Sequence, residues 1–224
     1  MTKIALNKDP REEKKRIAAE IRSSLAERNI LAVNFISSPG SGKTTLLERI
    51  LPMLRNEYCL AVIEADTATR NDADRLEAVG VDVEMIANAI TGCHISVAAA
   101  KKAFDALDLD NLDLVVIENV GNLVCPSGVD LGEDHKIVLV SVAEGEDKPL
   151  KYPQIFRNSS LALINKIDAA DALGADVGLL ENNVRSTNPS IDILHISART
   201  GVNCDAVIDW IRLQLREKRS NNQA

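Results

Sequence analysis

The chain has 224 residues, of which 46% are hydrophobic and 26% are charged, and its formal net charge is −7. This length and composition are typical of one globular domain with a sizeable core, and the acidic balance argues against nucleic acid as the main partner, because a phosphate backbone needs a basic face. No run reaches the ~18 apolar residues of a membrane span, and the first residues lack the apolar core of a signal peptide, so we expect a cytoplasmic protein without a membrane partner.

The first predicted element is a charged helix over residues 10–28. Its apolar residues Ile17, Ile21 and Leu25 are spaced by four and form one stripe, which we expect to dock on the main domain or on a partner. We therefore divide the chain into three parts. Residues 1–29 form a helical extension, residues 30–218 form the main domain, and residues 219–224 form a polar, disordered tail.

From residue 30 onward, strand-like segments alternate with helix-like segments. This alternation predicts an α/β fold with a doubly wound, mostly parallel sheet flanked by helices. Aromatic residues make up only 3% of the chain, which predicts a core of Val, Ile, Leu and Ala. The expected strands are 30–36, 59–64, 82–87, 113–118, 136–142, 160–165 and 191–196. The expected helices are 43–55, 70–79, 93–106, 172–186 and 203–218.

The segment Ser37–Thr44 reads S-S-P-G-S-G-K-T and lies between an apolar strand and a helix, as a phosphate-binding loop requires. Gly40 and Gly42 let several backbone N–H groups face one anion, and the helix N-terminus adds its positive end. Lys43 is expected to reach the β- and γ-phosphates, and the Thr44 hydroxyl to bind Mg²⁺. Ser37 stands where the common pattern has glycine. An ordinary Gly/Ser turn is the alternative interpretation. The expected nucleotide contacts of this segment are Gly40, Ser41, Gly42, Lys43, Thr44 and Thr45.

Acidic residues follow two of the expected strands, at the edge where such sheets bind ligands. Asp66 comes just after the strand 59–64, and Glu118 ends the strand 113–118. Either carboxylate could hold Mg²⁺, and Glu118 could also orient the attacking water. Gly121 could donate its N–H to the γ-phosphate and move upon hydrolysis. Strand-end acids also occur as helix caps or ion-pair partners, which is the alternative.

The motif Asn165-Lys166-Ile167-Asp168 follows the expected strand 160–165 and indicates a guanine-binding loop. The Asp168 carboxylate can accept two hydrogen bonds from guanine N1–H and the 2-amino group, and adenine does not offer this pair. Two charge-assisted bonds of ~1.5–3 kcal/mol each amount to on the order of 10²- to 10⁴-fold discrimination. Lys166 could cover the base and Asn165 could tie this loop to the phosphate loop. The later segment Ser197-Ala198-Arg199 could supply a backbone N–H to guanine O6.

Cys93, His94 and Cys125 are candidate ligands for a soft metal such as Ni²⁺ or Zn²⁺. Cys93 and His94 stand at an expected helix start, which would lower the pKa of the Cys93 thiol, and Cys125 follows Gly121 by four residues. Three ligands leave a tetrahedral set incomplete, which suits metal delivery. The alternative is two buried cysteines and an unrelated histidine. The other cysteines, Cys59 and Cys204, are interpreted as core residues, and His135 and His195 as structural.

Taken together, S-P-G-S-G-K-T-T, T-G-C-H, V-V-I-E-N-V-G-N-L-V-C-P, E-G-E-D-K-P and N-K-I-D resemble the HypB family of nickel-incorporation GTPases over about residues 10–216. The resemblance implies a SIMIBI-class P-loop GTPase that dimerises upon binding GTP. It also implies nickel insertion into the large subunit of [NiFe]-hydrogenase, with a small zinc-containing HypA-type protein as partner. Matched by motif, Cys93, His94 and Cys125 correspond to a metal site at the dimer interface. Lys148 corresponds to a lysine that reaches nucleotide across the dimer.

The sequence therefore predicts a GTPase, converting GTP and water to GDP and phosphate, that uses Mg²⁺ and carries Ni²⁺ or Zn²⁺. Residues 1–30 contain neither Cys nor His, unlike those relatives that carry a nickel-binding N-terminal segment. A urease-type nickel accessory GTPase is one alternative, although its Cys-Pro-His motif differs from Gly92-Cys93-His94. A non-catalytic zinc protein stabilised by nucleotide is another. Intrinsic hydrolysis is expected to be slow, because no arginine finger is identifiable in the chain.

Overall fold

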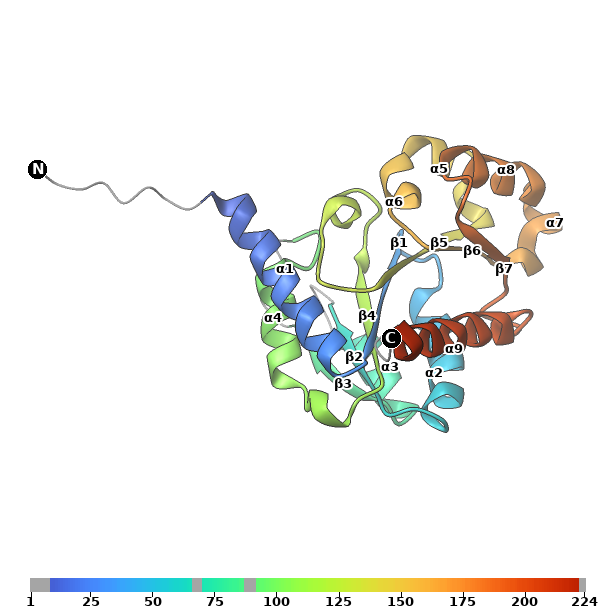
Figure 1. Ribbon diagram of the computed structural model, residues 1–224. Helices are drawn as coiled ribbons and strands as arrows, with labels where there is room; N and C mark the ends of the chain where they lie inside the picture. The colour runs from blue at the N-terminus through green and yellow to red at the C-terminus, as the bar shows by residue number, and fades with distance from the viewer. Residues whose placement is uncertain (1–8, 66–69, 87–91, 222–224) are drawn as a thin grey trace, which may run out of the picture.

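The computed structural model describes residues 9–65, 70–86 and 92–221, and in this part of the chain seven strands form one parallel sheet (Figure 1). The strand order is β3-β2-β4-β1-β5-β6-β7, so β1 lies in the middle, between β4 and β5. The strands are β1 Leu31–Ser37, β2 Leu60–Glu64, β3 Asp82–Met85, β4 Leu114–Gly121, β5 His135–Ser141, β6 Leu161–Asn165 and β7 Asp192–His195. The doubly wound parallel sheet predicted from the sequence is confirmed.

Helices cover both faces of the sheet because both faces are apolar. The helices are α1 Pro10–Glu27, α2 Lys43–Arg55, α3 Asn71–Ala78, α4 Val97–Ala106, α5 Lys148–Lys151, α6 Pro153–Arg157, α7 Ala170–Leu173, α8 Val177–Thr187 and α9 Cys204–Asn221. Val33 and Phe35 of β1 pack in one cluster with α2 and α9, whereas Ala32 packs on the opposite side with α1 and α4. The other end of this second face is covered by α6 and α8. The core is mainly aliphatic, as the composition predicts.

Two predicted helices differ from those in the structure. The helix expected over 93–106 begins only at Val97, because Ser96 is its N-cap and accepts a hydrogen bond from the Ala99 N–H at 3.2 Å. The prediction that Cys93 and His94 stand at a helix start is therefore wrong. The helix expected over 172–186 is two helices, α7 and α8, because Gly174 at φ 64° ends the first one. The short helices α5 and α6 were not predicted.

Helix α1 is docked on the domain rather than detached from it. Ala18, Ile21 and Leu25 are buried on one stripe of the helix and contact the cluster that includes α4. Ile21 also lies against Gly132, where an added Cβ would come within 2.7 Å of the isoleucine Cβ. At the other end of the chain, α9 continues to Asn221, so residues 219–221 are helical. Among the described helices, none has the length and apolarity needed to cross a bilayer.

Candidate nucleotide and metal site

The segment after β1 has the backbone of a phosphate-binding loop. Gly40 and Gly42 adopt φ values of 71° and 97°, in the region that favours glycine, and α2 starts directly after Gly42. Ser37 is the last residue of β1, in a strand conformation that any residue can adopt. This explains why serine is tolerated at the position where the common pattern has glycine. The predicted strand, loop and helix are all present.

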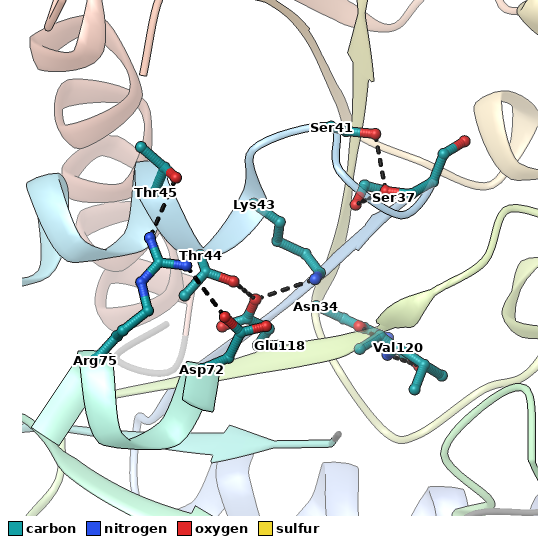
Figure 2. A network of polar contacts seen from close by, with 12 residues as sticks. Asn34, Ser37, Ser41, Lys43, Thr44, Thr45, Asp72, Arg75, Glu118 and Val120 are labelled. Carbon is teal, nitrogen blue, oxygen red and sulfur yellow. Dashed lines mark hydrogen bonds and ion pairs between the residues drawn. The ribbon is translucent and has the colours of Figure 1, made fainter. Parts of the chain in front are cut away.

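At the start of α2, two side chains converge on the Glu118 carboxylate (Figure 2). Lys43 Nζ lies 3.0 Å from Glu118 Oε1, and the Thr44 hydroxyl donates to the same oxygen at 2.6 Å. The side chains of Lys43 and Glu118 are only 10% and 2% exposed, and among the described residues Glu118 Oε2 has no hydrogen-bond partner. A buried, unpartnered carboxylate oxygen beside a threonine hydroxyl fits the oxygen ligands that Mg²⁺ prefers.

A second buried acid, Glu64, was not selected from the sequence. It ends β2 directly beside Glu118 in the sheet register, is 2% exposed, and lines the same cavity. The carboxylate that the sequence favoured at this strand end, Asp66, lies outside the described residues. Glu64 was overlooked because it continues the apolar run of β2 and so looks like part of the strand rather than of its loop.

The strand ends surround a cavity of about 860 Å³, which is large enough for a nucleotide. Residues of the phosphate loop, of β4 and of the N-K-x-D loop line it together. Gly92, Cys93 and Asn122 also line this cavity, so it reaches one of the candidate metal ligands, Cys93. The predicted residues that line it are Gly40, Ser41, Gly42, Lys43, Thr44, Thr45, Cys93, Glu118, Gly121, Asn165, Lys166, Asp168, Ala198 and Arg199.

Asn165, which also lines the cavity, connects three segments. Its Nδ2 donates to the Ser41 carbonyl at 2.7 Å, and its Oδ1 accepts from the Ala198 N–H at 2.9 Å. The predicted tie between the N-K-x-D loop and the phosphate loop is therefore present. Lys166, in a left-handed conformation at φ 63°, donates to the Gly40 carbonyl at 2.7 Å.

The Asp168 carboxylate is fixed at the mouth of this region. The buried Ser197 hydroxyl donates to Asp168 Oδ1 at 2.6 Å, and Arg199 Nε lies 3.8 Å from Oδ2. Ser197 itself does not line the cavity, so in this structure it contacts Asp168 rather than the open space. One carboxylate oxygen thus accepts a hydrogen bond from a hydroxyl, and the other lies near an exposed guanidinium.

Lys148 stands at the first turn of α5 and does not line the cavity of its own chain. Its Nζ lies 3.7 Å from Glu144 Oε2 and 5.3 Å from the centre of the Tyr152 ring. Glu144, which was not predicted, accepts hydrogen bonds at its Oε1 from the Ser41 hydroxyl at 2.7 Å and from the Ser141 N–H at 2.9 Å. The E-G-E-D-K-P segment therefore contacts the phosphate loop through an acid as well as carrying the lysine.

Arg75 of α3 is a cation in the cavity lining that the sequence did not reveal. Its Nη2 lies 3.3 Å from the Thr45 hydroxyl, and it forms an ion pair with Asp72 at 3.1 Å (Figure 2). A second ion pair joins it to Glu48 at 2.6 Å. These two carboxylates neutralise the charge of Arg75 and hold its guanidinium in place. The local sequence offers no signal for it beyond a polar loop and helix start.

The three candidate metal ligands meet although they come from two separate loops. The nearest ligand atoms of Cys93, His94 and Cys125 all lie within 4.8 Å of one another, and Cys93 Sγ is 3.4 Å from His94 Nδ1. All three residues are half-buried. The sequence left open whether the two cysteines and the histidine lie together or are unrelated, and in the structure they lie together. Two thiols and an imidazole suit Ni²⁺ or Zn²⁺.

The protonation of this cluster differs from the prediction. The contact with the Cys125 thiol, with a further contribution from burial, raises the pKa of the Cys93 thiol, whereas the sequence led us to expect a lowered value. The reason is that α4 begins four residues later than expected, and a second thiol lies beside Cys93 instead. Burial, together with the charge of Lys14, lowers the pKa of His94 and favours the neutral imidazole that binds metals.

Of the remaining cysteines and histidines, three match their predicted roles. Cys204 is buried in the core at the start of α9. His135 Nδ1 lies 2.9 Å from the Ser160 hydroxyl with its ring edge-on to Trp210, and His195 Nε2 lies 2.9 Å from Glu181 Oε2. Cys59 is exposed, so the prediction that it is a core residue is wrong. It precedes β2 rather than belonging to that buried strand.

The fold and the cavity define a P-loop nucleotide-binding protein of the doubly wound class. Residues 31–195 match the family described as "CobW/HypB/UreG, nucleotide-binding domain". Within that family, the chain belongs to the HypB hydrogenase maturation factors. It is 45% identical to "Hydrogenase maturation factor HypB" of Escherichia coli over 89% of this chain and 68% of that protein. It is 38% identical to the "Probable hydrogenase maturation factor HypB" of Methanocaldococcus jannaschii over 96% of both chains.

Solved structures agree with this assignment. HypB from Archaeoglobus fulgidus superposes with a TM-score of 0.84 at 36% identity, over 91% of this chain and 99% of that one. HypB from Helicobacter pylori, solved in complex with nickel, superposes with a TM-score of 0.83 at 36% identity, over 95% and 98%. The signal recognition particle receptor FtsY of Elizabethkingia anophelis, at 18% identity and a TM-score of 0.52, shares the fold alone. The P-loop fold of the SIMIBI class is thereby confirmed.

Proposed function

We propose that this chain is a GTP-hydrolysing metallochaperone that assists nickel insertion into [NiFe]-hydrogenase. The observation that carries the proposal is the single cavity of about 860 Å³, whose lining runs from the phosphate loop to Cys93. A nucleotide in one part of this cavity and a metal beside the other would share β4 and the loop after it. Membership in the HypB family and the nickel-bound structure of a relative support the same function.

The nucleotide half of the proposal assigns roles to the residues at the phosphate loop. Lys43 would bind the phosphates, and Thr44 and Glu118, with Asp66, would hold Mg²⁺, which would supply charge neutralisation at the phosphates. Glu118, already buried against Lys43 and Thr44, could also orient the attacking water. Gly121 would donate its N–H to the γ-phosphate. The nucleotide contacts of the loop would come from Gly40, Ser41, Gly42, Lys43, Thr44 and Thr45.

The base would lie against the N-K-x-D loop. The Asp168 oxygens would accept the guanine N1–H and 2-amino hydrogens, and the Ser197–Arg199 segment would supply a backbone N–H to O6, with Ala198 already fixed by Asn165. Lys166 would exchange its contact with the Gly40 carbonyl for the face of the base. Preference for guanine over adenine then follows from hydrogen-bond complementarity at one carboxylate.

The metal half of the proposal places Ni²⁺ or Zn²⁺ on Cys93, His94 and Cys125 at the interface of a GTP-bound homodimer. Three ligands per chain leave room for a ligand from elsewhere, which suits transfer rather than permanent locking. Lys148, which does not line the cavity of its own chain, would reach the nucleotide of the second chain. A zinc-containing HypA-type protein and the hydrogenase large subunit would be its partners in the cytoplasm, with no role for nucleic acid or membranes.

A urease-related role is a second candidate, and one observation favours it. A relative from Helicobacter pylori, 36% identical over 92% of this chain, is named "Hydrogenase/urease maturation factor HypB". Genes for hydrogenase, and not urease, beside the gene of this chain would support the hydrogenase role. A non-catalytic zinc protein is excluded if phosphate release continues over multiple turnovers.

The decisive experiment measures Ni²⁺ affinity and molecular mass with GDP and with a non-hydrolysable GTP analogue. We expect a dimer and a changed affinity in the analogue, because a nucleotide can shift the metal site only if the two states differ in affinity. Cys125→Ala should lower the metal stoichiometry and spare GTP binding. Cys59→Ala, at an exposed cysteine distant from the cluster in sequence, serves as the control. Equal affinities in both states, or unchanged stoichiometry in Cys125→Ala, would refute the proposal.

A further inference from the structure

Asn122 connects the two loops that carry the candidate metal ligands. Its Nδ2 donates to the carbonyl oxygen of Cys93 at 3.1 Å. Its Oδ1 accepts from the N–H of Val124 at 2.8 Å and from the N–H of Cys125 at 3.4 Å. One half-buried side chain therefore holds the backbone of both cysteines, which are 32 positions apart in the sequence.

The same residue is adjacent to the phosphate loop. Gly121, its neighbour and the last residue of β4, is the register partner of Ser37. A Cβ added to Gly121 would lie 2.9 Å from the Cα of Pro39, so the two backbones are in direct contact. Asn122 and Cys93 both line the nucleotide cavity. A change at the phosphate loop can therefore reach Asn122 through one peptide unit.

The strand before Asn122 is fixed by a second asparagine. The buried Asn119 accepts at its Oδ1 from the N–H of Val120 at 3.0 Å and of Ile95 at 3.5 Å, and its Nδ2 donates to Asn34 Oδ1 of β1 at 3.3 Å. These bonds anchor β4 up to Val120. Beyond that point the chain passes through Gly121 to Asn122, so a displacement of Gly121 would act directly on the bonds of Asn122.

We propose that Asn122 is a positioning residue that sets the apposition of the Cys93 and Cys125 thiols and transmits the nucleotide state to them. This inference rests on the proposed function, which supplies the nucleotide and the metal. The bonds to Val124 and Cys125 alone would describe an Asx turn, a local feature of the loop. The bond to the Cys93 carbonyl is different, because it joins a segment 29 residues away in the chain and fixes one thiol relative to the other.

Two substitutions separate these roles. Asn122→Ala removes every bond of the side chain, whereas Asn122→Asp keeps the acceptor for Val124 and Cys125 and removes the donor to Cys93. Asn188→Ala is the matched control. Asn188 also joins two segments, donating to the carbonyls of Phe156 and Ser159 and accepting from the Ser190 N–H, but it is the C-cap of α8 and lies outside the nucleotide cavity.

The first measurement needs neither metal nor nucleotide. In metal-free protein with Cys59→Ser, the oxidant diamide is added and the rate of Cys93–Cys125 disulfide formation is followed by mass spectrometry. We expect the rate to fall on the order of 10-fold in both Asn122 variants, because the thiols are no longer held together, and to stay unchanged in Asn188→Ala. Wild-type rates in Asn122→Ala would overturn the inference. A wild-type rate in Asn122→Asp would mean that Asn122 only forms the local turn at Val124 and Cys125, and this result would also overturn the inference.

The second measurement is Ni²⁺ affinity with GDP and with the GTP analogue. Residues that orient metal ligands typically change affinity by ~10–100-fold when substituted, and we expect both Asn122 variants to lose affinity in this range and to lose the difference between nucleotide states. If wild type shows no such difference, the proposed function fails, while the disulfide rate still tests the Asn122 bridge. If wild type shows the difference and Asn122→Ala retains it in full, the proposed function stands and this inference fails.

Discussion

The contact between Gly42 and Asn165 gives the sharpest test of how the phosphate loop is held. Gly42 adopts φ 97°, and a Cβ added there would lie 2.6 Å from Asn165 Nδ2. Gly42→Ala therefore introduces two separate costs. The backbone must hold an alanine in a left-handed conformation, and the Asn165 side chain must move away from the Ser41 carbonyl and the Ala198 N–H that it now contacts.

The sizes of these costs can be worked out in the absence of nucleotide. Left-handed backbone costs an L-residue ~1–2 kcal/mol, and each of the two lost hydrogen bonds removes ~0.5–1.5 kcal/mol. We therefore expect Gly42→Ala to lower the free energy of unfolding by ~2–5 kcal/mol. Gly174→Ala is the matched control, because its φ is 64° and nothing lies within 4 Å of an added Cβ. It should cost only the backbone part, ~1–2 kcal/mol.

The test is completed by measuring urea unfolding of Gly42→Ala, of Asn165→Ala and of the variant that carries both substitutions. Asn165→Ala alone loses the same two bonds, so the double variant should cost less than the sum of the singles by ~1–3 kcal/mol. A double variant that is additive within ~0.5 kcal/mol would show that Gly42 and Asn165 act independently, and the steric reasoning would be wrong. Equal losses in Gly42→Ala and Gly174→Ala would contradict it as well.

Two further predictions concern the base and a half-buried histidine. Asp168→Asn should lower GTP affinity by on the order of 10²- to 10⁴-fold and improve binding of xanthosine triphosphate. Titration of the variant with both nucleotides checks this. An unchanged preference for GTP over xanthosine triphosphate would contradict the role of Asp168. Burial lowers the pKa of His135, so the unfolded state takes up a proton near its ordinary pKa of ~6.5 while the folded state does not. Stability is therefore lost as the pH falls from ~6.5 through the lower pKa of the folded state. Urea midpoints between pH 8 and 5 should fall less steeply in His135→Gln, and parallel profiles would refute this contribution.

The central strands and the helices that cover them could be predicted from the sequence because each carries its own pattern. The run before the phosphate loop is apolar except for Asn34, and β1 is buried over all its residues. Short helices do not carry such a signal. Helices α5 and α6, at four and five residues, are shorter than two helical turns and show no periodicity. The start of α4 had a signal, Ser96 as an N-cap, but the preceding Cys and His were read into the helix.

The residues of the candidate site likewise divide into those that a local sequence pattern predicts and those that it does not. Lys43 and Asp168 belong to contiguous motifs, so their positions could be derived from local spacing. Glu144 and Asn122 act through partners that are 103 and 29 residues away, and such contacts depend on the strand order, which the sequence alone does not fix. The thiol pKa shows the consequence: its direction was predicted wrongly because the dominant neighbour of Cys93 is Cys125, which local reasoning could not place there.

The buried ion pair of Lys43 and Glu118 explains why nucleotide binding should act on the metal loop. If Lys43 moves to the phosphates, Glu118 is left without its cation at 2% exposure, and an unpaired buried charge is strongly unfavourable. Another cation must replace Lys43, so on the proposed function nucleotide and Mg²⁺ bind together. Glu118 lies on the strand that ends at Gly121 and leads into Asn122. On the proposed function, this exchange of charge would therefore take place on the strand that leads into Asn122, the residue proposed to position the two cysteines.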